Sequence, residues 1–534
     1  MRFDPRFNPV AIVTLAATVA GLFGAYFMGQ AAAQGNVRFI AIVFGVGAGM
    51  LVVFTMGNSI WLLIPLCWPL TGRLGGLPLP FSVRELAVIA AFGVFIAQIA
   101  MKRRSMHTSP SNAPELFLWL NAAFICTMFA RNPVGVAFLG SDTVGGRPYL
   151  SVLVGLMAFI VLRFCFIPGN LAKVFPLLLL GPNFIVGFLG SITVFFPFLT
   201  PIIFPVYSGI DVTGYVAEEY FGQSGAPESL GSARISSFSF IGIALITGVV
   251  AYNNPLKAMS IGYPKLFFLM VLGTLFVGMA GFRNILFVAV LTVIIAAYLW
   301  NGGAGIIKTM LLGCFFLGAV IVTQSVVELP RSIQRSFSFF PGPWNPDIVK
   351  GANESTDWRF DMWKMALTTD RYIQNKLLGD GFGFSRTELE IMFNASIGGA
   401  GYVGADAAKE AFMVQGSFHS GPVSTIRFAG YIGLILLVVL MFLNAKYAWK
   451  LFNRAKGTQL QPLAIILVIY SLYSPVYFLF IFGEYRNDLP AAFFNLGMLK
   501  LLENSLAANT KEADAVAPKI AGPKPGDQKQ FAMS

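Results

Sequence analysis

The chain has 534 residues and is poor in charge: Asp, Glu, Lys and Arg together make up 12% of it. An average globular protein carries roughly 25%. The sequence also lacks a GxxxxGK[ST] phosphate loop and an HExxH zinc motif. A composition this apolar excludes a soluble enzyme with a Rossmann or TIM fold, and it excludes a nucleic-acid-binding protein.

Cysteine and histidine are scarce as well. The cysteines, each within an apolar segment, are Cys67, Cys126, Cys165 and Cys314. This pattern forms neither a disulfide framework nor a zinc-binding spacing, so we expect free buried thiols, no metal site and no cofactor. The histidines are His107, in the basic run MKRRSMH, and His419, near the end of a long polar segment.

What the chain does have is long apolar runs. Apolar residues make up 56% of it, and the mean hydropathy is +0.71. Because a bilayer core requires roughly 20 apolar residues per helix, the sequence predicts an all-α polytopic membrane protein with 12–14 transmembrane helices. The expected spans are 10–29, 38–56, 58–70, 82–101, 114–131, 148–167, 173–199, 238–254, 264–281, 284–300, 305–323, 427–446, 461–482 and 488–502.

The charges between these runs predict an orientation. Of the net charge of +12, most of the excess lies in short loops between apolar runs. Basic clusters favour the cytoplasm, and they all fall on that side when the short run 58–70 crosses the membrane. Both termini are then cytoplasmic, and segments 200–237 and 324–426 lie outside. We therefore expect a multi-pass protein of the bacterial inner (cytoplasmic) membrane.

Four regions follow from this layout. Residues 1–323 form a transmembrane helix bundle, residues 324–426 a periplasmic loop domain, and residues 427–503 the C-terminal transmembrane helices. Residues 504–534 are rich in Lys, Ala, Pro and Asp, and they predict a disordered cytoplasmic tail because they cannot bury a core.

The large loop contains helix signals. Thr356 is expected to cap an amphipathic helix over STDWRFDMWKMAL. Glycines within 379–383 predict a tight irregular turn, and Ser385 with Glu388 predicts a capping box that opens a second helix. Pro422 suits the first turn of the following transmembrane helix.

Arginines at the expected outer face are candidate ligand-binding residues. Arg283 lies between two apolar runs, Arg359 on the loop helix, and Arg234 just before a span. Ionisable side chains at such depth usually have a function, and a guanidinium binds phosphate oxygens with two parallel hydrogen bonds. The alternative is that these arginines extend to lipid headgroups.

His419 is the candidate general base. It precedes an expected helix start, and a helix N-terminus disfavours imidazolium, so the ring should be neutral near pH 7. A neutral imidazole accepts a proton from a hydroxyl. The alternative is a loop histidine held by a backbone hydrogen bond.

Together, these residues predict a reaction. Arginines would bind a diphosphate leaving group without a metal, and His419 would activate an acceptor hydroxyl. Nucleotide sugars are absent outside the cytoplasmic membrane, so the donor is expected to be a glycan linked to a polyprenyl diphosphate.

Three segments in order carry a family resemblance: Arg359 to Ala366, then LLGDGFGF, then FHSGPVSTIRFAGYIGLI, with MAGFRNILF upstream. Across about residues 230–450, this pattern resembles the O-antigen ligase and O-antigen polymerase superfamily of bacterial membrane glycosyltransferases. The chain departs from it at Ser420, where many members have Asn, and at Asn284, where Gly is common.

The resemblance implies a GT-C-like helical fold, a periplasmic active site and metal-independent inverting transfer. It assigns Arg283 and Arg359 to diphosphate binding and His419 to catalysis. The implied partners are an undecaprenyl-diphosphate-linked glycan donor, a glycan or lipid A–core acceptor, membrane lipids and polysaccharide assembly or export proteins, with no nucleic acid. Ligase and polymerase remain open, as do two alternatives: a transporter or flippase of lipid-linked glycan, and a non-catalytic assembly subunit.

Overall fold

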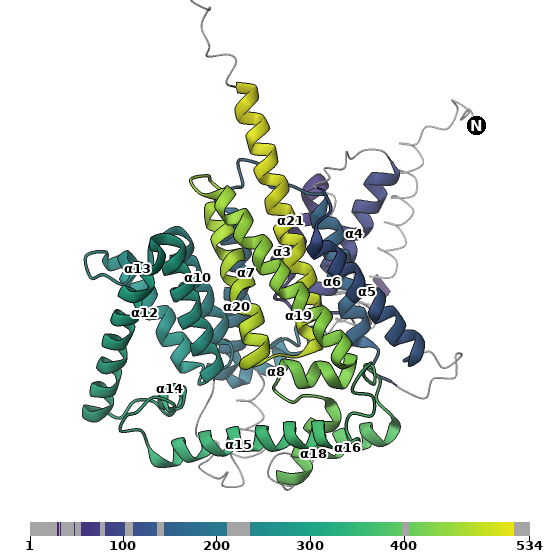
Figure 1. Ribbon diagram of the computed structural model, residues 1–534, viewed down its shortest axis with the longest axis vertical. Helices are drawn as coiled ribbons and strands as arrows, with labels where there is room; N and C mark the ends of the chain where they lie inside the picture. Colours follow the sequence, from purple (N-terminus) through teal and green to yellow (C-terminus); the bar gives the residue numbers. More distant parts are fainter. Residues whose placement is uncertain are drawn as a thin grey trace, which may run out of the picture.

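The computed structural model of the chain is helical (Figure 1). It describes residues 55–74, 81–101, 110–135, 144–210, 235–397 and 405–516, together with residues 29, 30, 33 and 47. Within these residues there is no β-strand, and only isolated bridges such as Val144 with Phe384 occur.

Long apolar helices form the body of the protein. They are α4 (Val83–Ala100), α5 (Ala113–Arg131), α6 (Arg147–Arg163), α7 (Phe175–Phe195), α10 (Phe238–Tyr252), α12 (Pro264–Met279), α13 (Arg283–Val326), α19 (Gly421–Ala455), α20 (Gln461–Phe480) and α21 (Tyr485–Val516). Short elements between them are η1 (Gly57–Leu62), α3 (Leu63–Cys67), η3 (Pro197–Leu199), α8 (Thr200–Ile203) and α11 (Pro255–Ala258).

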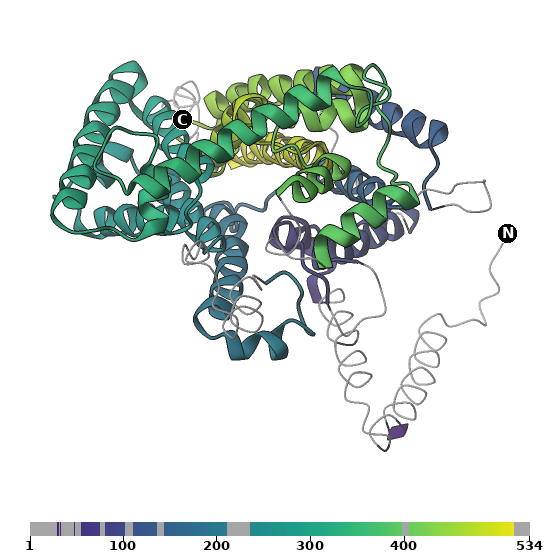
Figure 2. The same cartoon turned by 90° about the horizontal axis from the view of Figure 1, so that it is seen from below.

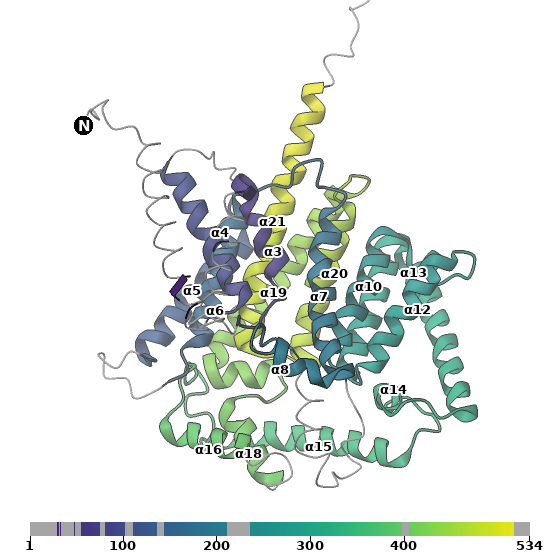
Figure 3. The same cartoon turned by 180° about the vertical axis from the view of Figure 1, so that it is seen from behind.

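Four further helices lie together at one end of the bundle, which we call the loop end. They are α14 (Arg331–Phe337), α15 (Pro346–Thr368), α16 (Arg386–Ile397) and α18 (Ala405–Gln415). Seen from below, α15 runs across the ends of the other helices (Figure 2). The C-terminal part of α21 projects from the opposite end, the tail end (Figures 1 and 3). Within residues 327–397 and 405–420, these helices cover the loop end.

In the described part of the chain, six helices are long and apolar enough to cross a membrane: α4, α5, α7, α13, α19 and α20. The chain is thus an all-α, multi-pass membrane protein, as predicted. The expected spans 284–300 and 305–323 are the two halves of α13, which breaks at Gly302 (φ 64°, ψ −155°). Spans 10–29 and 38–56 lie almost entirely outside the described residues, so the total of 12–14 stays a prediction.

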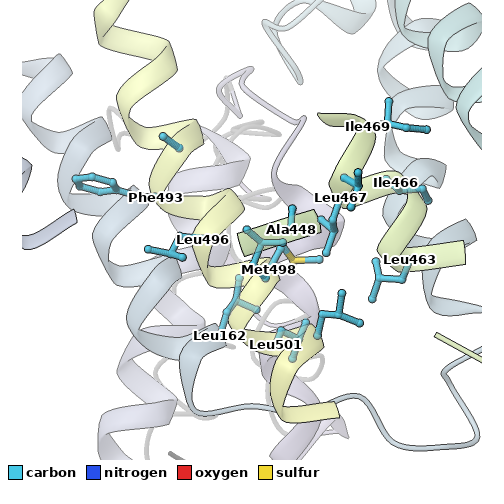
Figure 4. Close-up of a cluster of buried hydrophobic side chains, with 14 of the residues drawn as sticks. Leu162, Ala448, Leu463, Ile466, Leu467, Ile469, Phe493, Leu496, Met498 and Leu501 are labelled. Carbon is cyan, nitrogen blue, oxygen red and sulfur yellow. The ribbon is translucent and has the colours of Figure 1, made fainter. Parts of the chain in front are cut away.

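Helix α21 lies at the centre of the main core. Its side chains meet those of α6, α19 and α20, as Figure 4 shows for Phe493, Leu496 and Met498. The prediction of a disordered tail from Asn504 is wrong for its first part, since α21 continues to Val516. Asn504 donates to the carbonyls of Arg163 and Cys165 (2.7 and 3.0 Å), so it satisfies groups that the end of α6 leaves unpaired.

A buried charge cluster fixes α21 toward the tail end. The Lys500 side chain is fully buried, and its Nζ lies 2.7 Å from Glu115 Oε1 and 3.1 Å from Glu503 Oε2. Arg163 also contacts Glu115, at 2.8 Å. Buried charges are stable only when paired, so this cluster ties α21 to the start of α5 and the end of α6.

Helix α19 breaks at Gly430, and a strap covers the break. Gly430 has φ 66° and ψ −174°, a conformation essentially restricted to glycine. The strap, residues 376–381, donates from Asp380 and Gly381 to the carbonyls of Arg427 and Phe428 (3.0 and 2.9 Å) and accepts from the amide of Tyr431 (2.9 Å). A Cβ on Gly430 would lie 2.2 Å from the Leu377 carbonyl oxygen, so only glycine lets the strap approach.

The local helix signals were mostly predicted correctly. Ser385 and Glu388 form the expected capping box at the start of α16, and Pro422 lies in the first turn of α19. The expected cap at Thr356 is wrong: α15 begins at Pro346, and Asn345 caps it by accepting from the Asp347 amide (2.9 Å). The start signal was the Asn-Pro pair, because proline favours the first helical turn.

The loop end is predicted to face the outside of the cell, and cysteine labelling tests this. With the native cysteines replaced, Thr369→Cys at the exposed end of α15 should react with a membrane-impermeant maleimide in intact cells. Gln459→Cys, exposed in the turn between α19 and α20 at the tail end, should react only after lysis. The reverse pattern would overturn the orientation derived from the charges.

Candidate active site

His419 lies in a strained turn at the loop end, directly before α19. Its φ is +53°, and among the described residues no other non-glycine residue has a positive φ. The chain is fixed on both sides of it: Phe418 is fully buried and its carbonyl accepts from the Trp363 indole (2.7 Å), while Gly421 packs on Phe478. Backbone strain of this kind costs on the order of 1–3 kcal/mol and is concentrated at functional sites.

A small open cavity lies against the His419 ring. Its volume is about 110 Å³, and its walls come from α18, the turn before α19 and the turn between α20 and α21. The lining residues are Phe412, Gly416, Ser417, Phe418, His419, Phe482, Gly483 and Glu484. Two segments far apart in sequence, 412–419 and 482–484, thus meet at one end of the bundle.

Two glycines bring the turn before α19 against the turn before α21. A Cβ on Gly483 would lie 2.9 Å from the Gly421 Cα, and a Cβ on Gly421 would lie 2.4 Å from the Phe478 carbonyl oxygen. Any side chain at either position would force the turns apart. This contact therefore sets the distance between His419 and Glu484.

Glu484 and Arg486 are site residues that the sequence did not single out. Glu484 lines the cavity and pairs with Arg486, whose guanidinium also reaches Ser417 Oγ at 3.4 Å. Asn487 donates to Glu484 Oε2 (2.8 Å), and the Glu484 amide donates to Asp488 (2.7 Å). A sequence signal existed, since charged residues directly between two expected spans are functional candidates.

The expected neutrality of His419 is confirmed in direction. Burial lowers the pKa of its imidazole, the positive charge of Arg359 lowers that pKa further, and the negative charge of Glu484 opposes both. The sequence argument used the helix N-terminus, whereas desolvation is the largest cause in the structure. A pKa lowered from the ordinary value favours the neutral ring near pH 7.

Of the predicted arginines, Arg359 is near His419. It lies half-buried on α15 beside Trp358, whose ring centroid is 6.3 Å from that of His419. Arg283 is the half-buried first residue of α13 at the same end of the bundle. Arg234 lies outside the described residues.

The link from Arg283 to the cavity is indirect. The next residue, Asn284, donates to the Tyr477 hydroxyl (2.9 Å). The Tyr477 ring centroid lies 6.3 Å from that of Phe482, which in turn lies 5.4 Å from that of His419. The start of α13 is therefore two aromatic rings away from the candidate base.

Arg427 holds one acidic residue of the neighbouring strap and one of α16. Its guanidinium binds Asp380 (2.6 Å) and Glu388 (2.9 Å), and Asp380 also accepts from the amides of Gln374 and Asn375. Within the described residues, no group of three His, Cys, Asp or Glu side chains is arranged to hold a metal ion. Asp380, bound by Arg427 and by two amides, holds the strap against α19.

The electrostatics of His419 can be measured directly because the chain has two histidines. With ¹⁵N-labelled histidine in nanodiscs, His419 should titrate below the ordinary value of about 6.5. Glu484→Gln should lower this pKa further, because it removes a charge that favours imidazolium, and Arg359→Gln should raise it. His107→Ala assigns the signals, and unchanged titration in both site variants would contradict the described geometry.

Comparisons with known proteins give no family assignment for the chain. No family model matches the chain, and no curated protein matches it. The resemblance to O-antigen ligases and polymerases rests on residues 230–450 alone.

Proposed function

We propose that the chain is a membrane glycosyltransferase of the O-antigen ligase or polymerase type. It transfers a glycan from an undecaprenyl-diphosphate donor to an acceptor hydroxyl in a periplasmic site at the loop end. The bundle is GT-C-like in this proposal, and arginines in place of a metal bind the leaving group. Polysaccharide assembly or export proteins are its expected partners.

The observation that carries the proposal is the setting of His419. A half-buried imidazole in a strained turn borders an open cavity, and both the Arg359 cation and the Glu484 carboxylate act on it. The lowered pKa supplies the neutral form that a general base requires. The cavity supplies space for a hydroxyl next to the ring.

In the proposed step, a ring nitrogen of His419 accepts the proton of the acceptor hydroxyl. The acceptor oxygen forms a bond to the anomeric carbon of the donor sugar, and the bond from that carbon to the phosphate oxygen breaks. Undecaprenyl diphosphate leaves with the bonding electrons, and attack from the opposite side inverts the configuration. Arg359 and Arg283 bind the diphosphate as its negative charge grows.

Glu484 complements the base in this scheme. Proton transfer turns His419 into an imidazolium next to Arg359, which would be unfavourable in a half-buried site. The carboxylate of Glu484 on the cavity wall stabilises that imidazolium. Arg486 and Asn487 hold the carboxylate in place.

Removing the base should abolish most of the activity. A positioned general base contributes about 10²–10⁴-fold, so His419→Ala should lower glycan transfer by roughly that factor while donor binding persists. The assay is product formation from lipid-linked donor by purified protein in nanodiscs, with His107→Ala as control. Near-normal transfer would move the role of base to Glu484 or to another carboxylate. Donor movement across the membrane without transfer would indicate a flippase.

The diphosphate-binding role predicts that lysine cannot replace Arg359. Lysine keeps the charge but loses the paired hydrogen bonds, so Arg359→Lys should lower transfer at least about tenfold with the fold retained. The control is Arg371→Lys, an exposed arginine paired with Glu410 on the surface. Transfer should survive EDTA. A fully active Arg359→Lys, or loss in EDTA with rescue by a divalent ion, would contradict the proposal.

A further inference from the structure

The segment after α7 exposes apolar side chains at the loop end. From residue 174 to residue 210 the sequence contains no Asp, Glu, Lys or Arg, and Pro197, Pro201 and Pro205 prevent α7 from continuing as a regular helix. The chain instead forms the short elements η3 and α8, and Figure 3 shows α8 at the loop end. We call residues 195–206 the interfacial segment, because an uncharged apolar surface at the end of a membrane helix suits contact with lipid. Its side chains that are more than half exposed include Phe195, Phe196, Phe198, Ile202 and Val206.

Hydrogen bonds hold the end of the interfacial segment against the chain between α3 and α4. The Ser208 amide donates to the Arg73 carbonyl (2.9 Å), the Arg73 amide donates to Ser208 Oγ (2.9 Å), and the Gly72 amide donates to the Tyr207 hydroxyl (3.3 Å). A Cβ on Gly72 would lie 2.4 Å from the Gly209 amide nitrogen, so only glycine permits this approach. The backbone therefore fixes Arg73 beside the interfacial segment.

Arg84 adds a half-buried guanidinium to the same place. Arg73 and Ser82 form an isolated β-bridge, which brings the first turn of α4, with Arg84, next to Arg73. The Arg84 guanidinium lies over the Trp68 ring, 5.1 Å from its centroid, and within the described residues its Nε has no hydrogen-bond partner. Stacking on an aromatic ring holds a guanidinium in place without neutralising its charge. Arg84 is therefore a fixed cation.

Glu85 offsets this charge in part. Its carboxylate accepts from the Ser82 amide (2.6 Å), lies 3.6 Å from the guanidinium of Arg147 at the start of α6, and also acts on Arg84. Within the described part of these segments, the guanidinium groups of Arg73, Arg84 and Arg147 thus surround one carboxylate and leave an excess of positive charge. Basic residues are disfavoured at the face predicted to lie outside, so the excess indicates an anionic ligand.

We infer that this surface binds an anionic phospholipid of the leaflet at the loop end, with its phosphate at Arg73 and Arg84 and its acyl chains on the interfacial segment. A guanidinium binds phosphate oxygens with paired hydrogen bonds, and the exposed Phe198 and Ile202 offer apolar surface to the chains. The hydrogen bonds of Ser208 join the cationic and the apolar part of the surface, as a phospholipid joins its headgroup to its chains. The inference goes beyond the proposed function, because this lipid is neither donor nor acceptor.

Other ligands match one part of the surface only. A free phosphate would bind the arginines but leave the interfacial segment uncovered. A zwitterionic phospholipid would cover the segment, but its ammonium group would lie close to Arg73 and Arg84, which repel it. An anionic phospholipid uses both parts, since its headgroup carries no cation to offset the phosphate.

The test measures which lipid contacts the interfacial segment. With the native cysteines replaced, Phe198→Cys carries a bimane label in nanodiscs of mixed phosphatidylglycerol and phosphatidylcholine, in which the chains of one lipid or the other are brominated to quench the label. An arginine at an anionic surface strengthens attraction about fivefold, so two of them should favour phosphatidylglycerol roughly five- to 25-fold. Phe315→Cys, strongly exposed on α13, is the matched control and should show no preference. Equal quenching by both lipids at position 198, or quenching by neither, overturns the inference.

Variants of the arginines identify the headgroup site. In the Phe198→Cys background, Arg73→Gln and Arg84→Gln should each lower the preference for phosphatidylglycerol about fivefold, while the label stays in contact with lipid. Arg371→Gln, an exposed arginine at the loop end paired with Glu410, should keep the preference. If Arg84→Gln does not fold, Arg73→Gln carries the test, because the Arg73 side chain is exposed. An undiminished preference in Arg73→Gln overturns the inference.

Discussion

The candidate site depends on the break in α19 at Gly430. The backbone amides and carbonyls that this break frees need hydrogen-bond partners. Inside a membrane protein every freed amide and carbonyl needs a partner, and the break at Gly430 exposes several of them. The strap 376–381 supplies those partners, and Arg131 in turn donates to the strap carbonyls of Leu378 and Gly379 (3.1 and 2.9 Å). The first section of α19 can therefore end at Gly430 with the carbonyls of Arg427 and Phe428 paired to the strap. That section begins two residues after His419.

Charged residues near the site come from different elements, and some of them are already paired with one another. Arg427, in the first section of α19, is occupied by Asp380 and Glu388, so these carboxylates do not compete for the cavity. Arg359 approaches His419 from α15, while Glu484 approaches from the turn before α21. A cation and an anion therefore both act on the imidazole, with opposite effects on its pKa. Such a pair of charges suits a reaction in which one group gains negative charge and another gains a proton.

The sequence predicts the helices of the described chain better than it predicts the residues of the candidate site. Apolar length predicted most helices of the described chain, and fixed local spacings predicted the capping box of Ser385 and Pro422, because these signals act within a few residues. The continuation of α21 past Asn504 was missed because it depends on hydrogen bonds to the distant end of α6. Glu484 was missed for the same reason: its proximity to His419 arises from a contact between two glycines far apart in the sequence.

His419 combines several features that folding alone does not favour. A glycine at position 419 would relieve the strain of the positive φ. A polar residue that does not titrate would avoid placing a half-buried imidazole next to Arg359. Because the folded-state pKa of His419 is lowered, the unfolded chain binds the proton more readily, so this residue makes the fold less stable as the pH falls through the unfolded value of about 6.5. Strain, desolvation and an acid-sensitive loss of stability thus coincide at one side chain that borders a cavity. Residues that destabilise the fold in several ways at once are expected at functional sites.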